Sequence, residues 1–269
     1  MLLTLVTVLA GAAMIGPVRE VHAQDDKVQT DAIEQAVQRG VNYLIARQTP
    51  DGAIGSGRRY AAAHTALSLM SMLGVGHLPT DPTPQGKAMR DAVQFLLRDG
   101  LQNEQGYFGD ADSSRMYGHG IITLCLSELV GMNGDDEIDA KMRRRLEKAI
   151  DLILRSQRVQ KYDERFEGGW RYAPGARDAD LSVTVWQVMA LRSAKAAGVE
   201  VPSSAIDEAV AYLKRSFRED PRKPGGTFSY QPGNASAGYS QTAAGLLALQ
   251  VCGEYEAAEV DAAARWLLA

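Results

Sequence analysis

The chain has 269 residues, of which 45% are hydrophobic and 23% are charged, and its 29 basic and 33 acidic residues leave a net charge of −4. These values are typical of a folded protein, and they argue against a disordered chain and against a polybasic protein that binds nucleic acid. The two cysteines, Cys125 and Cys252, are too few for a disulfide framework or a four-cysteine zinc site.

The chain begins with an apolar segment. Residues 2–15 carry no charge and are too few to cross about 30 Å of hydrocarbon comfortably as a helix. Because Val21 and Ala23 are small residues of the kind that signal peptidase requires, we expect a signal peptide over residues 1–23, a folded domain over residues 24–269, and a secreted or periplasmic protein. An uncleaved membrane anchor is the alternative. No later apolar run is long enough to span a membrane.

A five-residue block of small and large apolar residues recurs along the rest of the chain. The blocks begin at Gly40, Ala92, Ala149, Ala209 and Ala263. Each block has the i, i+3, i+4 spacing of the apolar face of a helix. A glycine-containing turn follows each of the first four blocks, at residues 51–55, 105–109, 168–170 and 225–228. Three of these turns carry an aromatic residue, and the first carries Ile54 in its place.

A second, more apolar helix is expected after each turn. The expected ranges are His64–Leu73, Gly118–Leu129, Leu181–Ala194 and Tyr239–Val251. A helical hairpin cannot cover its own apolar face, so repeated hairpins stack and bury a shared core. The sequence therefore predicts an all-α array of about four and a half hairpins, with charged first helices outside and apolar second helices inside.

A Gln-x-x-x-Gly-x-aromatic turn between paired helices resembles the repeat of the terpenoid cyclases and of the protein prenyltransferase β subunits. The resemblance runs from about Ile33 to Ala269, and its best copies are Gln48–Gly52 and Gly168–Tyr172. It implies an α/α toroid in which about six hairpins close into a ring around a central cavity. Since only four and a half units are present and the last apolar helix has no cap, we expect an incomplete ring whose apolar edge favours self-association.

Asp178 and Asp180 precede the third of the expected inner helices. In hopene-type cyclases this place resembles an Asp-x-Asp-Asp-Thr motif, whose middle acid protonates an alkene. The resemblance implies that Asp180 is the acid and that Asp178 supports it, although Leu181 replaces the third carboxylate and Ser182 stands in the place of threonine. The alternative interpretation is that Asp180 only caps its helix, where its carboxylate accepts backbone N–H bonds.

The zinc site of the prenyltransferases uses aspartate, cysteine and histidine. The corresponding residues here are Asp180, Ser182 and Gln241. Serine and glutamine are poor zinc ligands, so we expect no zinc site and no other cofactor. Two histidines, His64 and His119, each stand at the start of an expected inner helix and could share one end of the cavity near Asp178 and Asp180, where they could hold a metal or act as a proton relay. A histidine there is more often a polar residue with satisfied hydrogen bonds.

Three hypotheses about function follow from these patterns. The leading one is a binding protein whose inner surface holds an isoprenoid, another apolar small molecule or a partner segment, with Gln241 and the histidines at that surface. The second is an enzyme resembling the terpenoid cyclases, with Tyr172, Trp186 and Tyr239 as aromatic residues of the cavity. The third is a scaffold without a pocket of ligand size.

Overall fold

The computed structural model describes residues 22–55, 57–234 and 238–269. By its internal contacts the chain divides into two units, Met1–Gly40 and Val41–Ala269. The elements are α1 (His22–Ile45), α2 (Ala61–Gly74), α3 (Pro84–Leu96), α4 (Arg115–Leu129), α5 (Asp136–Gln157), the 3-10 helix η1 (Glu164–Phe166), α6 (Leu181–Ala196), α7 (Ser203–Ser216), β1 (Phe217–Glu219), β2 (Gly226–Phe228), α8 (Tyr239–Val251) and α9 (Ala258–Leu268).

The first unit contains most of α1. The expected signal peptide, residues 1–23, lies outside the described residues except for His22 and Ala23, which begin this helix. Cleavage, secretion and membrane anchoring stay predictions. Among the described helices, none combines the length and the apolar character needed to cross a membrane.

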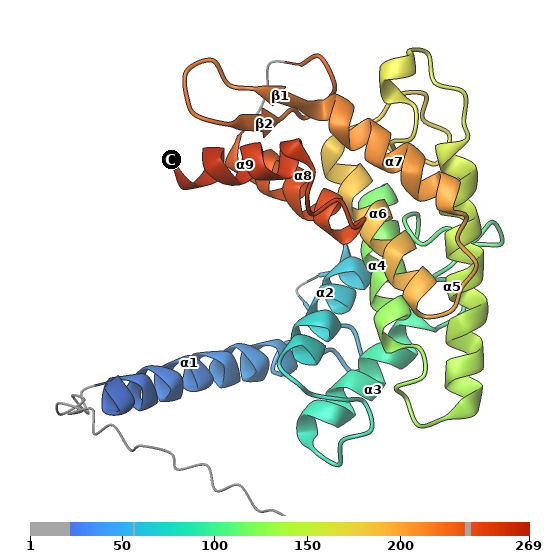
Figure 1. Cartoon of the computed structure of the whole chain (residues 1–269). Coiled ribbons are helices and arrows are strands. Elements are labelled where there is room, and N and C mark those ends of the chain that lie inside the picture. The colour runs from blue at the N-terminus through green and yellow to red at the C-terminus, as the bar shows by residue number, and fades with distance from the viewer. Residues whose placement is uncertain (1–21, 56, 235–237) are drawn as a thin grey trace, which may run out of the picture. The chain divides into compact units, whose positions relative to one another are not determined.

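The all-α prediction is confirmed in the second unit. The four expected inner helices correspond to α2, α4, α6 and α8, and each packs against the next in chain order. The outer helices α3, α5, α7 and α9 pack on this row, as the positions of α5 and α7 beside α4 and α6 show (Figure 1). The row of hairpins is therefore observed, whereas closure into a toroid stays a proposal.

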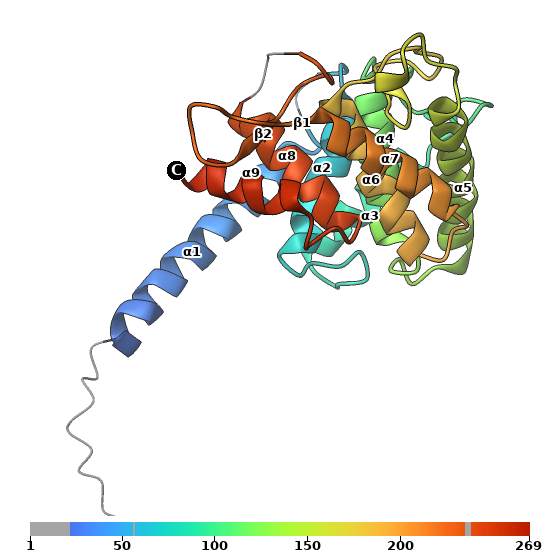
Figure 2. The ribbon, with the colours of Figure 1, turned by 45° about the horizontal axis from the view of Figure 1, so that its top comes forward.

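A small antiparallel sheet in the fourth turn departs from the prediction. Phe217 of β1 pairs with Phe228 of β2, and Figure 2 shows both strands beside α8 and α9. The first turn contains the same pairing as an isolated bridge between Gln48 and Ile54. Because Phe228 is equivalent to Ile54, its partner Phe217 is equivalent to Gln48. The sheet is a widened form of the repeated turn.

A glutamine side chain joins consecutive units in each of the first three turns. Its amide donates one hydrogen bond to the glycine carbonyl of its own turn and another to a carbonyl of the next outer helix. The acceptors are Gly52 and Ala88 for Gln48 (3.1 and 2.8 Å), Gly106 and Arg145 for Gln102 (2.9 and 2.9 Å), and Gly168 and Ala205 for Gln157 (3.1 and 2.8 Å). Sequence similarity in the turns thus reflects one repeated contact.

The turn glycines lie directly against the next outer helix. All four have positive φ, and a Cβ atom on any of them would come within 2.1–2.3 Å of a backbone oxygen. The glycines and the residues that carry these oxygens are Gly52 with Asp91, Gly106 with Lys148, Gly168 with Glu208, and Gly225 with Ala262. Only glycine combines this backbone conformation with so close an approach.

Each turn is also bonded to the inner helix that follows it. The amide of the aromatic residue, or of Ile54, donates to a side chain one turn into that helix. The donor and acceptor pairs are Ile54 with Thr65 (2.9 Å), Phe108 with His119 (3.4 Å), Trp170 with Thr184 (3.0 Å) and Phe228 with Thr242 (3.4 Å). His119 is therefore the counterpart of three threonines and is not the counterpart of His64.

The starts of the inner helices depend on the following unit. The amides of Tyr60, Met116 and Leu181 donate to the carbonyls of Asp112, Tyr172 and Tyr230, respectively. In addition, the Asp112 carboxylate accepts hydrogen bonds from Ala62 (2.9 Å) and Ala63 (3.2 Å). The helix α2 consequently begins at Ala61, before the expected His64, because a residue about fifty positions later caps it.

Candidate functional site

A cavity of about 330 Å³ lies among three inner helices. Its lining consists of Tyr117 from α4, then Leu181, Ser182, Val185, Trp186 and Met189 from α6, and Ser240, Gln241, Ala244 and Leu247 from α8. Three inner helices pack as successive neighbours here, so residues from three separate hairpins meet in one space. The volume is at the lower end of the range for sites that bind small molecules.

The lining of this cavity is mainly apolar and has no charged side chain among the described residues. On α6, Ser182, Val185, Trp186 and Met189 follow the i, i+3, i+4, i+7 spacing of one helical face. The polar groups are the hydroxyls of Tyr117, Ser182 and Ser240 and the amide of Gln241. Such a lining suits an apolar molecule with a neutral polar group, because burying an unpaired charge is costly.

Asp180 lies at the N-terminus of α6, next to the cavity but outside its lining. Its Oδ1 accepts hydrogen bonds from the Val183 amide at 2.9 Å and from the Ser182 hydroxyl at 2.6 Å. The first of these is the helix cap that the sequence suggested. The carboxylate is fully buried, so its hydrogen bonds replace those to water.

The guanidinium of Arg171 joins both candidate carboxylates. Its Nη1 lies 3.3 Å from Asp180 Oδ2, and its Nε lies 3.3 Å from Asp178 Oδ2. The side chain of Asp178 is partly exposed and lies 3.5 Å from the Gln231 amide nitrogen. Arg171 is not among the residues predicted from the sequence, although it directly follows the Gly-Gly-Trp turn.

Burial is the main influence on the titration of Asp180. It raises the pKa of this carboxyl, against the hydrogen bonds from Ser182 and Val183 and the charge of Arg171. The Ser182 hydroxyl, which lines the cavity, donates to Asp180 and is 2.5 Å from the Tyr117 hydroxyl. The Ser182 hydroxyl therefore links Asp180 to the lining of the cavity.

Tyr172 does not line the cavity in the described structure. Its ring lies 5.8 Å from the ring of Tyr117, the guanidinium of Arg171 stacks over it, and its hydroxyl is bonded to that of Tyr230. It is therefore part of the polar cluster at the start of α6. The structure thus places Tyr172 outside the lining of the cavity between α4, α6 and α8.

The two histidines occupy separate places. His119 is fully buried, with Nδ1 accepting the Phe108 amide and Nε2 at 3.2 Å from the Ala149 carbonyl. Burial lowers the pKa of His119 to about 4, so the ring is neutral at physiological pH. His64 is exposed and lines a different surface hollow beside Leu67. The structure does not join the two histidines in a relay, because both ring nitrogens of His119 face backbone groups and His64 lines a separate pocket.

The remaining predicted residues are divided between the cavity and the surface. Trp186 and Gln241 line the cavity, as expected of inner-helix residues. Tyr239 is 62% exposed, and its ring lies 4.8 Å from the Trp266 ring, away from the cavity lining. Within the described residues, no group of three or more histidine, cysteine or acidic side chains is placed to hold a metal ion.

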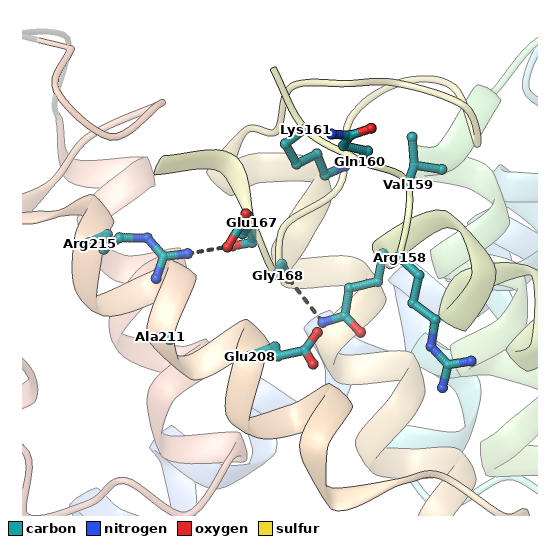
Figure 3. Close-up of a pocket in the computed structure, with 10 residues that line it drawn as sticks. Arg158, Val159, Gln160, Lys161, Glu167, Gly168, Glu208, Ala211 and Arg215 are labelled. Carbon is teal, nitrogen blue, oxygen red and sulfur yellow. Dashed lines mark hydrogen bonds between the residues drawn. The ribbon is translucent and has the colours of Figure 1, made fainter. Parts of the chain in front are cut away.

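A larger pocket of about 520 Å³ lies on the outer side, between the end of α5 and α7. Figure 3 shows Arg215 directed at Glu167. The carbonyl of Gly168 accepts a hydrogen bond from the side-chain amide of Gln157. Lys161 donates to the carbonyl oxygens of Ala176 and Asp178. These polar groups are therefore used to hold the turn, and the inner cavity is the better candidate site.

Comparison with known proteins gives no family for this chain. A scan against family models found no match, and a search of curated proteins found no significant relative. The resemblance to the terpenoid cyclases and prenyltransferases accordingly rests on the repeat residues alone.

Proposed function

We propose that the protein binds an apolar small molecule with a single neutral hydrogen-bonding group in the cavity between α4, α6 and α8. An isoprenoid alcohol is the class that fits this description together with the resemblance of the repeat. The main support for this proposal is the composition of the cavity lining, in which apolar side chains surround four uncharged polar ones.

The polar groups give the ligand a defined orientation. Ser182 lies at the start of α6 and Met189 lies two turns further along the same face. Ser240 and Leu247 are spaced in the same way on α8, and Gln241 is the next residue after Ser240. The hydroxyl of a bound alcohol would therefore lie beside Ser182 and Gln241, and its hydrocarbon tail would lie along Met189 and Leu247.

Equilibrium dialysis with labelled farnesol and farnesyl diphosphate tests this proposal. Labelled farnesol should bind once per chain, and the diphosphate should displace it at least about tenfold less effectively than unlabelled farnesol does, because the lining supplies no cation for it. Ala244→Phe fills the cavity and should abolish binding, whereas Ala243→Phe, at the neighbouring exposed position of α8, should not. Equal binding by both variants would refute the site.

Acid-catalysed cyclisation is the competing function. The buried Asp180, whose pKa is raised by burial, is the observation in its favour. Two observations count against it. Asp180 is separated from the cavity by Ser182, and only Tyr117 and Trp186 offer aromatic rings to a carbocation. Incubation with squalene that gave a cyclised product, lost in Asp180→Asn, would establish this function in place of simple binding.

Secretion, self-association and a purely structural role stay open to direct tests. Mass spectrometry of the N-terminus would show cleavage after Ala23 if the signal peptide is correct.

Self-association through the α9 edge, where Leu268 is 89% exposed, predicts a concentration-dependent mass in sedimentation. A scaffold predicts no binding of any lipid in the dialysis experiment.

A further inference from the structure

A third pocket, of about 390 Å³, lies between the turn that precedes α4 and the outer helix α5. It is formed by one face of α5 and by the turn residues Gln102–Glu104. Four basic residues, Lys141, Arg144, Arg145 and Lys148, line it. They follow the i, i+3, i+4, i+7 spacing and therefore lie along the same side of the helix.

The acidic groups at this pocket do not balance the basic ones. Asp99 contacts Arg145 at 3.1 Å and Lys141 at 3.5 Å, and Glu104 is the one acidic residue of the lining. The Asp99 side chain is 94% exposed, so its ion pairs are weak. Four positive charges against two negative ones leave the pocket positive in a chain whose net charge is −4.

The repeat architecture does not require Arg145 and Lys148 to be basic. In three outer helices, one backbone carbonyl accepts a hydrogen bond from a turn glutamine. This carbonyl belongs to Ala88, Arg145 and Ala205, so these three residues are equivalent. The turn glycines define a second equivalence, in which Lys148 corresponds to Asp91 and Glu208. The other units carry small or acidic residues at these places. The basic pocket thus occurs at one of these repeated positions, between residues 102–104 and α5.

Arg145 gives an independent indication of a ligand. Its side chain is only 13% exposed, and its Nη1 has no hydrogen-bond partner among the described residues. Burial lowers the pKa of Arg145, against the charge of Asp99. A buried guanidinium N–H without an acceptor is unfavourable, and a rotation of this side chain that brought Nη1 to an oxyanion in the adjoining pocket would remove that cost.

We propose that this pocket binds a multivalent oxyanion, namely a phosphate or sulfate ester group. Arg144 and Arg145 supply planar guanidinium donors for its oxygens, and Lys141 and Lys148 supply compact positive charges on either side of them. This site is separate from the apolar cavity, and its occupation does not depend on the function proposed for that cavity.

Calorimetric titration of the full chain with inorganic triphosphate at low salt tests the proposal. One saturable site is expected, with affinity that falls as salt is added. Arg144→Gln/Lys148→Gln should weaken binding at least about tenfold, because two charge-assisted contacts are lost. Lys87→Gln/Arg265→Gln changes the net charge equally at exposed positions elsewhere and should leave the affinity within about twofold of the wild type.

Two results would overturn the site: the absence of saturable binding, or an equal loss of affinity in the two double variants. The source of the anion is separated by a second titration with phosphatidylcholine vesicles that contain phosphatidic acid. Vesicle binding that is lost in Arg144→Gln/Lys148→Gln identifies a lipid phosphate. Triphosphate binding without vesicle binding identifies a soluble ester. Both of these outcomes support the site.

Discussion

The amide of Phe108 donates a hydrogen bond to Nδ1 of His119 at 3.4 Å, and this contact joins the second turn to its inner helix. Threonine hydroxyls accept the equivalent bond in the other three units. The opposite ring nitrogen of His119 faces the Ala149 carbonyl, so the neutral ring with hydrogen on Nε2 satisfies both contacts. Protonation of Nδ1 would remove the acceptor on which the turn depends.

His119 should make the stability of the fold depend on pH. Its pKa is about 4 in the folded state against about 6.5 in the unfolded state, so the unfolded state binds more protons between these values. The free energy of unfolding should fall by about 2 kcal/mol from pH 7.5 to pH 5.0 through this residue. Urea denaturation of His119→Thr should lack this part of the pH dependence, whereas exposed His64→Gln should retain it.

Replacement of a turn glycine should be strongly destabilising. In Gly168→Ala the new Cβ would lie 2.1 Å from the Glu208 oxygen, and φ is +79°. The clash and the left-handed backbone together should lower the free energy of unfolding by more than about 2 kcal/mol. Gly175→Ala is the matched control, because nothing lies within 4 Å of its added Cβ. Chemical denaturation with equal losses in both variants would contradict this account of the turns.

The glutamine contacts should be worth more than ordinary polar contacts at the surface. Gln157→Ala removes hydrogen bonds to the carbonyls of Gly168 and Ala205, and its side chain is buried. The unpaired acceptors and the lost volume should cost about 2–4 kcal/mol in unfolding free energy. Exposed Gln160→Ala should cost less than about 0.5 kcal/mol. A calorimetric melting temperature that is unchanged in Gln157→Ala would rule out this role.

Asp180 should stabilise the fold through its hydrogen bond to the Val183 amide as well as through its charge. Asp180→Ala removes the cap of α6 and leaves Arg171 with only Asp178 as an acidic partner, which should cost about 3 kcal/mol. Asp180→Asn keeps an oxygen for the Val183 amide and should lose less than half as much. Urea unfolding distinguishes the two, and equal losses would show that the charge alone matters.

The fold could be predicted because its main signal is local. Apolar spacing along each inner helix identified all four, and the end of α8 agrees with its expected range of Tyr239–Val251. The starts of α2 and α4 were set three residues too late. The contacts that determine them come from Asp112 and Tyr172 in the following units, which local spacing does not reveal.

The site was less predictable because it depends on contacts between units. Trp186 and Gln241 were found from their place on inner helices, and the helical spacing of Val185 and Met189 could have added these two residues. The sequence groups His119 with His64, whereas the hydrogen bonds of the turns make His119 the counterpart of Thr65. The hydrogen bonds of the turns show which residues of the four repeats are equivalent, and the sequence does not reveal these hydrogen bonds.

The fluorescence of Trp186 during titration with farnesol tests the binding proposal most directly, because Trp186 is the one tryptophan that lines the cavity in the described structure. We predict a saturable shift of the emission spectrum that is absent in Trp186→Phe, and a half-saturation point raised at least about tenfold by Ala244→Phe but unchanged by Ala243→Phe. A spectrum that does not respond in the wild type, or that responds equally in Trp186→Phe, would contradict the proposal.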